Sequence, residues 1–377
     1  MKRAEALSQI RNDFVPNHRV SYISALHHHL GDHLEELEQN VLRIFTEACT
    51  KVKQLQDEAR KGKIQHIHIT FFRHRIIHQD FRIRVYFYDH ELYGDPLEYM
   101  VEYDASWAFN YLKQFSELLL NESKMYVGKI FKPDLDLITR QEVSLYMHYV
   151  ANLLRHVMKT VVEQDAFLQM QKEVEVFIRA GEYKDFNELV YKYDSCDLNT
   201  DEVRQRLTPN DHDEYVHGNF RGLDLSDMYF KLVNLSYSYF TAAILNGSQL
   251  IGCPLIGADF RHTNLIHANF AHSLIHGADF SEANLTEAQL EEVNGSYIKP
   301  NREEFHIPPF VATRFRGANL TGTRFAHADL RGADFRGALF KETIFEECQL
   351  QGAHFDERDI LQLELSQEQL NELSIYF

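Results

Sequence analysis

Large apolar residues recur at every fifth position over much of the C-terminal half of the chain. Every fifth residue from Phe220 to Leu290 is Phe, Leu or Ile, and the same holds from Phe315 to Ile360. An α-helix repeats its apolar face every 3.6 residues and a β-strand every two, so neither produces a period of five. The pattern therefore predicts a repeat architecture in which each five-residue unit forms one short side of a coil.

A second position, two residues before each large residue, holds a small side chain. It is always Ala, Ser, Thr or Cys from Ser238 to Ala288, and again from Thr313 to Ala353. Glycine often follows two residues after the large residue, as at Gly247, where a turn needs it. Each unit is thus expected to bury one large and one small side chain and then to turn.

These units resemble the pentapeptide-repeat family, whose units read Ala-Asp/Asn-Leu/Phe-x-x. Matching units include "ADFRH", "TNLIH", "ANFAH", "ADFSE", "ANLTG" and "ADFRG". The resemblance covers residues 217–362 and implies a right-handed, four-sided (quadrilateral) β-helix with about 20 residues in each coil. Residues one coil apart would then stack, with one ladder of Phe220, Phe240, Phe260 and Phe280 and another of Phe315, Phe335 and Phe355.

The two ends of such a rod must be covered, because exposed stacking edges pair with other chains. At the start, Leu223, Met228 and Val233 occupy the small position, which predicts a widened first coil that meets the N-terminal domain. At the other end, residues 363–377 predict a short helix with Ser366 as its N-cap. This helix is expected to cap the rod, and a homodimer formed through it is the alternative.

The repeat is interrupted at residues 294–312, where Gly295 and Pro300 occupy the large position. Two interpretations are open: one distorted coil, or a loop that leaves the rod and returns in phase, which the prolines of this segment favour. Loops on rigid scaffolds often carry function, although a tolerated surface insertion is the simpler interpretation. The partner-binding residues predicted in this loop are Lys299, Arg302, Glu303, Glu304, Phe305 and His306.

Residues 1–195 show no repeat and predict an α+β domain. An amphipathic helix is expected at 32–60, and three strands with alternating patterns follow as a meander between residues 64 and 104. A Thr139–Glu142 capping box indicates a helix start. Further helices are expected at 105–121, 140–163, 166–180 and 184–193. Residues 196–216 are polar and are expected to link the two halves.

One face of the predicted sheet carries polar side chains from all three strands. They are His66, His68, Thr70, Arg82, Arg84, Glu98 and Glu102. His66, His68, Arg82 and Arg84 could form an anion or ligand site. The simpler interpretation is a solvated face on which opposite charges pair across strands.

Signals for metal binding and catalysis are weak. His27, His28 and His29 with His33 invite a zinc hypothesis, but Gly31 lies between them and no Cys or carboxylate is spaced to complete a site. We therefore expect no metal and no other cofactor. The motifs GxSxG, HExxH, the Walker loop and GxGxxG after a strand are absent, so no catalytic residue is predicted. An enzyme or enzyme accessory with a site in residues 1–195 is kept as a less favoured alternative.

Composition and charge limit the function classes. The chain has 377 residues, 44% of them hydrophobic, and a formal net charge of −17, which is typical of a globular protein of two or three domains. No apolar run could span a membrane, the start lacks a secretory signal, and the four separated cysteines fit a reduced cytoplasmic setting. The acidity argues against a direct nucleic-acid or membrane partner.

The favoured function is a non-catalytic scaffold or adaptor that binds a protein partner, with the rod as spacer or docking surface. The family resemblance implies an alternative, because its best-understood members resemble a DNA duplex and protect type II topoisomerases (gyrase and topoisomerase IV) from inhibitors. The charge pattern departs from such mimicry, since residues 217–292 have a net charge of −5 but residues 313–340 have +3. The sequence does not name the partner.

Overall fold

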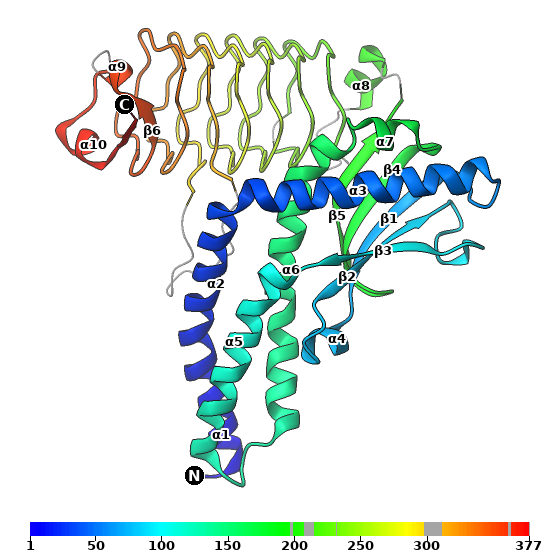
Figure 1. The fold of residues 1–377 in the computed structure, drawn as a ribbon. Coiled ribbons are helices and arrows are strands. Elements are labelled where there is room, and N and C mark those ends of the chain that lie inside the picture. Colours follow the sequence, from blue (N-terminus) through cyan, green and yellow to red (C-terminus); the bar gives the residue numbers. More distant parts are fainter. Residues whose placement is uncertain (197–198, 207–214, 231, 298–310, 361–362, 377) are drawn as a thin grey trace. The chain divides into compact units, whose positions relative to one another are not determined.

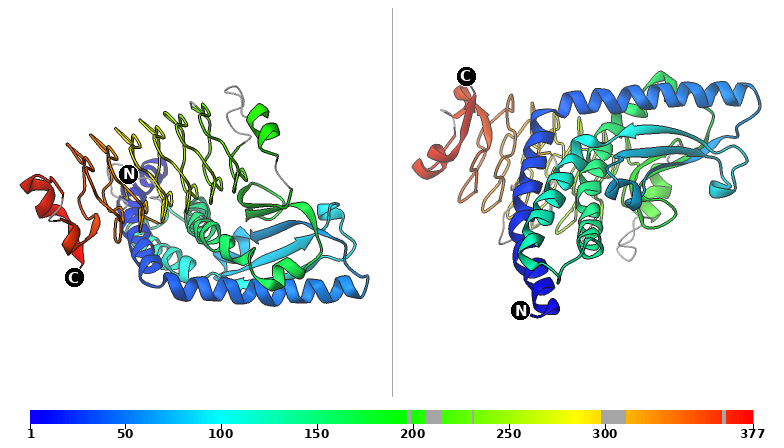
Figure 2. Two further views of the ribbon diagram at one scale, coloured as in Figure 1. Left: turned by 90° about the horizontal axis from the view of Figure 1, so that it is seen from above. Right: turned by 60° about the horizontal axis from the view of Figure 1, so that its bottom comes forward.

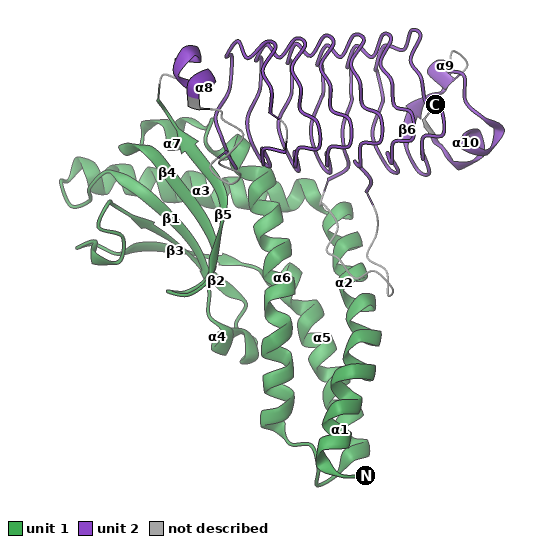
Figure 3. Cartoon of the chain, turned by 180° about the vertical axis from the view of Figure 1, so that it is seen from behind, with its two compact units in different colours: residues 1–196, 299–310 green, residues 197–298, 311–377 purple. Residues whose placement is uncertain are grey.

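The chain folds into two compact units in the computed structural model (Figure 3). The described residues are 1–377 except 197–198, 207–214, 231, 298–310, 361–362 and 377. Unit 1 comprises residues 1–196, and unit 2 comprises residues 197–298 and 311–377. Each unit has its own secondary structure and its own core.

Unit 1 begins with a long helical region. Its elements are α1 (Arg3–Gln9), a π-helical turn η1 (Ile10–Phe14), α2 (Val15–Asp32) and α3 (Leu34–Asp57). The widened turn η1 lies just before Pro16, which has no N–H to donate and whose ring clashes with the preceding turn of a regular helix. The amphipathic helix expected at residues 32–60 corresponds to α3, which buries Leu37, Val41 and Phe45.

Two further helices form a hairpin in the same unit. α5 (Ser106–Ser123) is followed by a 3-10 turn η3 (Lys124–Tyr126) and by α6 (Lys132–Val161). The expected start of a helix near residue 140 is wrong, because the N-terminal cap of α6 lies at Phe131, whose N–H donates to Asp134 Oδ2 at 3.0 Å. Thr139 lies inside α6, and its hydroxyl donates to the carbonyl oxygen of Leu135 at 3.0 Å.

A five-stranded sheet with the strand order β3-β2-β1-β4-β5 forms the other layer of unit 1. Its strands are β1 (Ile64–Phe71), β2 (Arg82–Tyr88), β3 (Tyr99–Asp104), β4 (Lys172–Glu182) and β5 (Asn187–Asp194). The first three are antiparallel neighbours, and β4 pairs in parallel with β1. Short helical elements precede three of the strands: α4 (Arg73–Ile77) before β2, η2 (Leu92–Gly94) before β3 and α7 (Asp165–Gln169) before β4.

The helices expected at residues 166–180 and 184–193 are wrong, because most of these residues form β4 and β5. β4 buries Val176, Ile178 and Ala180 on one face, which is the period-two pattern of a strand. β4 and β5 form an antiparallel hairpin, and β4 adds the parallel partner that β1 lacks in a three-strand meander. The sheet therefore has five strands rather than three.

Helices α3 and α6 cover one face of this sheet (Figures 1 and 2). The ring of Phe45 on α3 lies 6.3 Å from the ring of Phe87 on β2. The covered face consists of buried aliphatic and aromatic side chains: Ile67, Ile69, Ile83, Val85, Phe87, Val176 and Ile178. The alternation of side chains along a strand places His66, His68, Arg82 and Arg84 on the opposite face.

Unit 2 is a stack of coils (Figures 1 and 3). Parallel bridges join residues 20 apart, such as Asn219 with Tyr239 and Asp224 with Ile244, and successive bridges lie five residues apart along the chain. The large residue of each unit points inward, and Phe240 and Leu285 have no exposed surface. The repeat predicted from the period of five is therefore a β-helix-type coil.

The two ladders expected for Phe220–Phe280 and Phe315–Phe355 are one continuous ladder, so the expectation of two separate ladders is wrong. Phe240 stacks on Phe260 with ring centroids 4.8 Å apart, and Phe280 stacks on Phe315 at 5.1 Å. Bridge partners lie 35 residues apart at this point instead of 20, as for Asp279 with Arg314. Fifteen residues are thus inserted between two coils that remain in phase.

A short helix covers the start of the rod. α8 (Thr200–Arg206) contributes Val203 to the same core as Leu223 and Val233, with Met228 packed against it. The Arg204 guanidinium donates to the carbonyl oxygens of Asp224 and Ser226 at 3.0 and 2.9 Å. The polar segment expected to be a linker therefore contains a helix that packs against the first coil.

The C-terminal residues cover the other end of the rod. Their elements are β6 (His354–Asp356), α9 (Glu357–Ile360), α10 (Gln367–Glu372) and β7 (Ser374–Tyr376). Ser366 caps α10 as predicted, since its side chain accepts from Gln369 N–H at 3.2 Å. The Gln369 side-chain amide donates to the carbonyl oxygens of Phe345 and Cys348 at 3.0 and 2.8 Å. The helix is shorter than expected, because residues 374–376 pair with β6.

Candidate functional site

The polar face of the sheet in unit 1 brings together two of the four residues predicted as an anion or ligand site, His66 and His68, whose ring centroids lie 6.1 Å apart. His68 pairs with Tyr86 across β1 and β2, and its neighbour on the other side is Arg179 of β4. His68 is buried, and its Nδ1 lies 3.4 Å from the hydroxyl of Tyr93. Burial, followed by the charges of His66 and Arg179, lowers the pKa of His68 to about 4, so this imidazole is neutral at physiological pH.

The two predicted arginines of this face, Arg82 and Arg84, are paired with carboxylates. Arg82 is the first residue of β2, where it pairs with Asp80 at 2.9 Å and Glu102 at 3.2 Å. Arg84 lies 3.6 Å from the same Glu102, and it also donates to Tyr86 Oη at 3.2 Å. Hydrogen bonds from Arg82 hold the pKa of the Asp80 carboxyl well below its usual range. Asp80 and Glu102 therefore compensate the charges of Arg82 and Arg84, which leaves little positive potential around these two arginines.

Sequence reasoning missed a cluster of tyrosines on this face. Tyr86 and Tyr88 stack 5.5 Å apart on β2, and Tyr93 and Tyr183 reach them from two loops. Tyr88 donates to Glu98 Oε1 at 2.9 Å, and its pKa is raised by burial and by this bond. The alternation of β2 already placed Tyr86 and Tyr88 beside Arg84, but only the fold shows that loop tyrosines cover them.

The histidines near the junction of α2 and α3 do not converge on one point. His27 is buried, and its Nδ1 lies 3.5 Å from the hydroxyl of Tyr149. His29 and His33 stack 4.2 Å apart, and burial, followed by the charge of His33, lowers the pKa of His29. Among the residues that the structure describes, no group of three or more His, Cys, Asp or Glu side chains could hold a metal ion.

His29 and His33 instead line an open pocket of about 340 Å³. Its wall also carries Trp107, whose indole N–H donates to Tyr103 Oη at 2.9 Å, and Asp104, which accepts from Ser106 N–H at 2.9 Å. The pocket is large enough for a small ligand. Its remaining lining residues are Glu36, Leu37, Asn40, Arg43 and Ile44.

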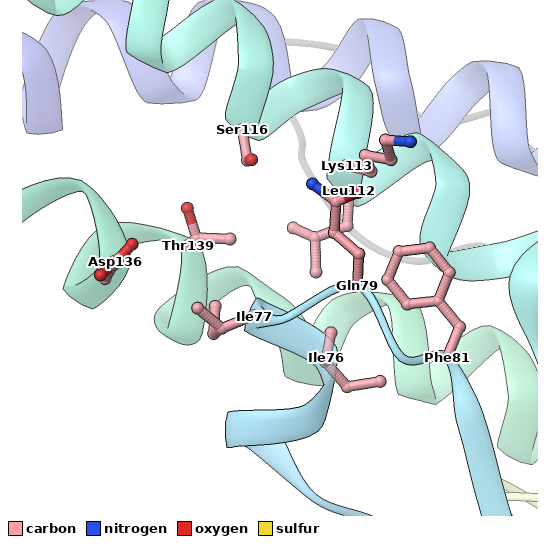
Figure 4. Close-up of a pocket in the computed structure, with 9 residues that line it drawn as sticks. All are labelled: Ile76, Ile77, Gln79, Phe81, Leu112, Lys113, Ser116, Asp136 and Thr139. Atoms are coloured by element: carbon pink, nitrogen blue, oxygen red, sulfur yellow. The ribbon is translucent and has the colours of Figure 1, made fainter. Parts of the chain in front are cut away.

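Two further hollows occur in unit 1. A cavity between α4, α5 and α6 has a volume of about 40 Å³ and is lined by residues such as Ile76, Leu112 and Thr139 (Figure 4). This volume suits a water molecule rather than a substrate. A groove of about 400 Å³ lies beside α6 and the β4–β5 hairpin, where Arg73 pairs with Glu182 at 2.7 Å.

The rod collects arginines from both of its halves on one side. The bridge column that starts at Asn219 and Tyr239 continues through Asp259, Asp279, Arg314, Asp334 and His354. Two residues after these positions stand Arg221, Arg261, Arg316 and Arg336. We call this set, with Arg314, the arginine face.

The arginine face carries its own counter-charges. Arg261 pairs with Asp259 at 2.7 Å, and Arg316 and Arg336 both pair with Asp334 at 2.5 and 2.7 Å. Burial opposes ionisation of Asp334, but the hydrogen bonds from Arg336 and Arg316 outweigh it and lower its pKa to about 2. This side of the rod is therefore a row of alternating charges rather than a negative surface.

The outer turns of the coils carry a second regular pattern. A histidine of one coil pairs with a glutamate of the next at four places, with distances of 3.1 to 3.3 Å. The pairs are His262–Glu282, His267–Glu287, His272–Glu292 and His327–Glu347. All of these side chains are more than half exposed, so such pairs add little to the stability of the rod.

The predicted partner-binding loop cannot be placed. Lys299, Arg302, Glu303, Glu304, Phe305 and His306 lie outside the described residues. The described residues on either side of it, Tyr297 and Thr313, both belong to coils: Tyr297 N–H donates to Arg331 O at 2.8 Å, and the Thr313 hydroxyl donates to Gly295 O at 2.8 Å.

Comparison with known families identifies the class of protein to which this rod belongs. The family model for pentapeptide repeats matches residues 234–271, 243–281, 253–294 and 318–356, all of them in unit 2. The C-terminal part of the chain is therefore a pentapeptide-repeat structure, and unit 1 is not assigned to a family. No curated protein matches the chain significantly.

Solved structures of pentapeptide repeat proteins align with part of the chain. Rfr23 from the cyanobacterium Cyanothece 51142 is 20% identical over 37% of this chain and 84% of its own, with a TM-score of 0.17. A trypsin-treated variant of QnrB1, a plasmid-mediated fluoroquinolone resistance protein, is 16% identical over 44% of this chain and 87% of its own, with a TM-score of 0.22. A pentapeptide repeat protein from the thylakoid lumen of Arabidopsis thaliana is 24% identical over 40% of this chain and 73% of its own, with a TM-score of 0.16. At these scores the alignments carry no further argument.

Proposed function

We propose that the chain is a non-catalytic scaffold, in which unit 1 recognises one protein partner and the outer faces of the rod hold a second. For the rod itself we propose the right-handed, four-sided coil of the pentapeptide-repeat family, which four bridges in every 20 residues support. The scaffold proposal rests on the repeat architecture and on what fills its interior.

The observation that carries this proposal is the filled interior of the rod. Its inward positions hold stacked large residues and small residues, and side chains such as Phe260, Leu265 and Ala268 have no exposed surface. Such an interior has no room for a substrate, so the rod can act only through its outer faces. Repeat proteins use their extended outer surfaces in this way.

A scaffold should hold different proteins at its two units, which site-specific photo-crosslinking can test. We would place a photo-crosslinking amino acid at Leu339 on the rod and, in a second sample, at Phe186 in unit 1, because both side chains are well exposed. In the native cells, the two positions should each form an adduct with one dominant protein, and the two proteins should differ. Adducts at neither position, or at only one of them, would contradict a scaffold with two working surfaces.

Protection of a type II topoisomerase is the alternative that the pentapeptide repeat suggests, because the best-understood members of that family protect these enzymes from inhibitors. The arginine face argues against DNA mimicry, because a mimic needs continuous negative potential. Expression of the full chain in a fluoroquinolone-susceptible bacterium decides between the two. A severalfold rise in the inhibitory drug concentration over an empty-vector control would favour protection, and the scaffold proposal predicts no change.

An enzyme in unit 1 is the second alternative, and the pocket lined by His29, His33 and Trp107 is the feature that favours it. It is less supported, because the Ser106 hydroxyl donates to Asp104 within the turn that begins α5, and no hydrogen bond joins Ser106 to His29 or His33 among the residues described. A thermal-shift screen of metabolites tests this alternative. A metabolite that raises the melting temperature of the wild type but not of His33→Ala would favour an enzyme in unit 1.

A further inference from the structure

Large apolar side chains are exposed together at the tip of the α5–α6 hairpin. This tip lies at the same end of unit 1 as α1 and the N-terminus (Figures 1 and 3). Met125 is 71% exposed and Val127 is 84% exposed, which are high values for apolar residues in a folded segment. The exposed apolar residues of the tip are Leu120, Met125, Val127 and Phe131.

The local fold keeps these side chains outside. Tyr126 and Ile130, which alternate with them, are buried, so the chain cannot rotate the exposed set inward without expelling the buried one. Gly128 has a φ of +72°, and Lys129 N–H donates to Tyr126 O at 3.0 Å to close the turn. The exposure of Met125 and Val127 is thus built into the turn.

The charge of the tip is opposite to that of the whole chain. Residues 120–133 contain three lysines, Lys124, Lys129 and Lys132, and one acid, Glu122, whereas the chain has a net charge of −17. Lys124 donates to the Asn121 side chain at 2.9 Å, and none of the three lysines forms an ion pair with a carboxylate in the described part of the chain. Their charges are therefore available to an anionic partner.

We propose that this tip, residues 120–133, docks reversibly on an anionic lipid surface. Met125 and Val127 enter the boundary between headgroups and acyl chains, and the three lysines lie at the level of the lipid phosphates. Exposed apolar side chains beside basic ones are the combination that holds a protein at such an interface. A stable protein–protein interface needs about 800 Å² from each partner, which suits a broad surface better than a narrow hairpin end, whereas a bilayer can deform around it.

This proposal revises the expectation that the acidic chain has no membrane partner. The described residues contain no helix with the length and apolar content to cross a bilayer, and docking of a hairpin tip does not need one. The net charge is a sum over the whole surface, but electrostatic attraction to lipid decays within a Debye length of about 8–10 Å. The charge of the tip therefore determines whether the tip is attracted to an anionic bilayer.

Vesicle co-sedimentation of the full chain tests the proposal. The chain should bind vesicles of phosphatidylcholine with phosphatidylserine, should bind pure phosphatidylcholine vesicles much less, and should lose binding at high salt. A double variant, Met125→Ser with Val127→Ser, and a charge variant, Lys129→Glu with Lys132→Glu, should each weaken binding about tenfold or more. Val127→Trp should strengthen it, because Trp favours the membrane interface.

The matched control is Phe186→Ser, which removes a similarly exposed apolar side chain from the β4–β5 turn and should leave vesicle binding unchanged. Thermal melts should show that the tip variants fold, since the changed side chains are largely exposed. Absence of binding to anionic vesicles, or equal binding by the tip variants and the wild type, would overturn the proposal. So would a dimer in light scattering that the Met125→Ser, Val127→Ser variant dissolves, because the tip would then bind a second copy of the chain.

Discussion

At the scale of single residues, the small position of the repeat has a second role besides leaving space for the large side chains inside the rod. Where it holds Ser or Thr, the hydroxyl donates to a backbone carbonyl of the preceding coil. Ser248 donates to Leu225 O at 2.7 Å, and Thr263 donates to Phe240 O at 2.8 Å. These hydroxyls are buried, and leaving one without a partner would cost about 1–3 kcal/mol. This hydrogen bond explains why the buried small position accepts Ser or Thr in some units in place of Ala.

The same position should not accept a larger side chain. Ala333 is fully buried, so Ala333→Leu inserts methylenes into a filled interior and should lower the free energy of unfolding by about 1–3 kcal/mol. Chemical denaturation would measure the loss. Ala271→Leu is the control, because Ala271 stands on the outer side of a coil and is partly exposed. Equal stability of the two variants would mean that the inward assignment of Ala333 is wrong.

His68 should make stability fall in mild acid. Its pKa is about 4 in the folded chain, below the usual value of about 6.5 that applies when unfolded. Between about pH 6.5 and 4, His68 is therefore protonated in the unfolded state but not in the folded state. The free energy of unfolding, which is highest above about pH 6.5, declines as the pH falls towards 4. The loss is about 3 kcal/mol at most.

Denaturation of wild type and His68→Phe across this pH range isolates the effect, because the histidines other than its neighbour His66 keep their surroundings in the variant. The free energy of unfolding should fall more steeply towards low pH in the wild type than in the variant. Parallel curves would show that His68 is protonated in the folded state as readily as in the unfolded one.

At the scale of elements, the interruption of the rod behaves as an insertion between complete coils. Removal of residues 298–312 joins Tyr297 to Thr313 and restores a 20-residue spacing from Asp279 to Arg314. The shortened chain should therefore keep a thermal stability close to that of the wild type. Removal of residues 298–314 is the control, since it leaves that coil two residues short and should destabilise the rod strongly. A similar loss in both deletions would contradict the insertion.

The elements of unit 1 show where sequence patterns stop being decisive. α3 and β1 to β3 follow from periods of 3.6 and two. The sequence pattern did not predict β4 and β5, because a short apolar segment such as 174–180 fits the period of a helix as well as that of a strand. The partner of β4, β1, also lies about a hundred residues earlier in the chain. The parallel pairing with β1 settles the strand, and local propensity cannot report a contact so remote in sequence.

At the scale of the whole molecule, unit 2 should fold without unit 1. Its core is made of residues from Val203 onward, and it has its own cover at each end. A fragment of residues 199–377 should therefore be monomeric and melt cooperatively by circular dichroism. A fragment of residues 217–377 lacks α8, exposes the first coil, and should be less stable or aggregate. Equal behaviour of the two fragments would show that α8 is not a cap.

The coiling of unit 2 also redistributes charge. Along the chain the rod separates into an acidic and a basic half, but Arg221 and Arg261 of the first half share one side with Arg316 and Arg336 of the second. The aspartate partners of Arg261, Arg316 and Arg336 lie on the same side, so these charges pair locally.

The sequence by itself determined the rod, its period, its inward residues and the N-cap of its last helix. It could do so because a solenoid makes its contacts between neighbouring repeats, so a local pattern contains the tertiary structure. Only the tertiary structure decided that β4 and β5 complete the sheet, that tyrosines cover His68, and that one ladder crosses the insertion from Phe280 to Phe315. These features depend on residues distant in sequence, whose pairing is set by packing in three dimensions and not by any repeat along the chain.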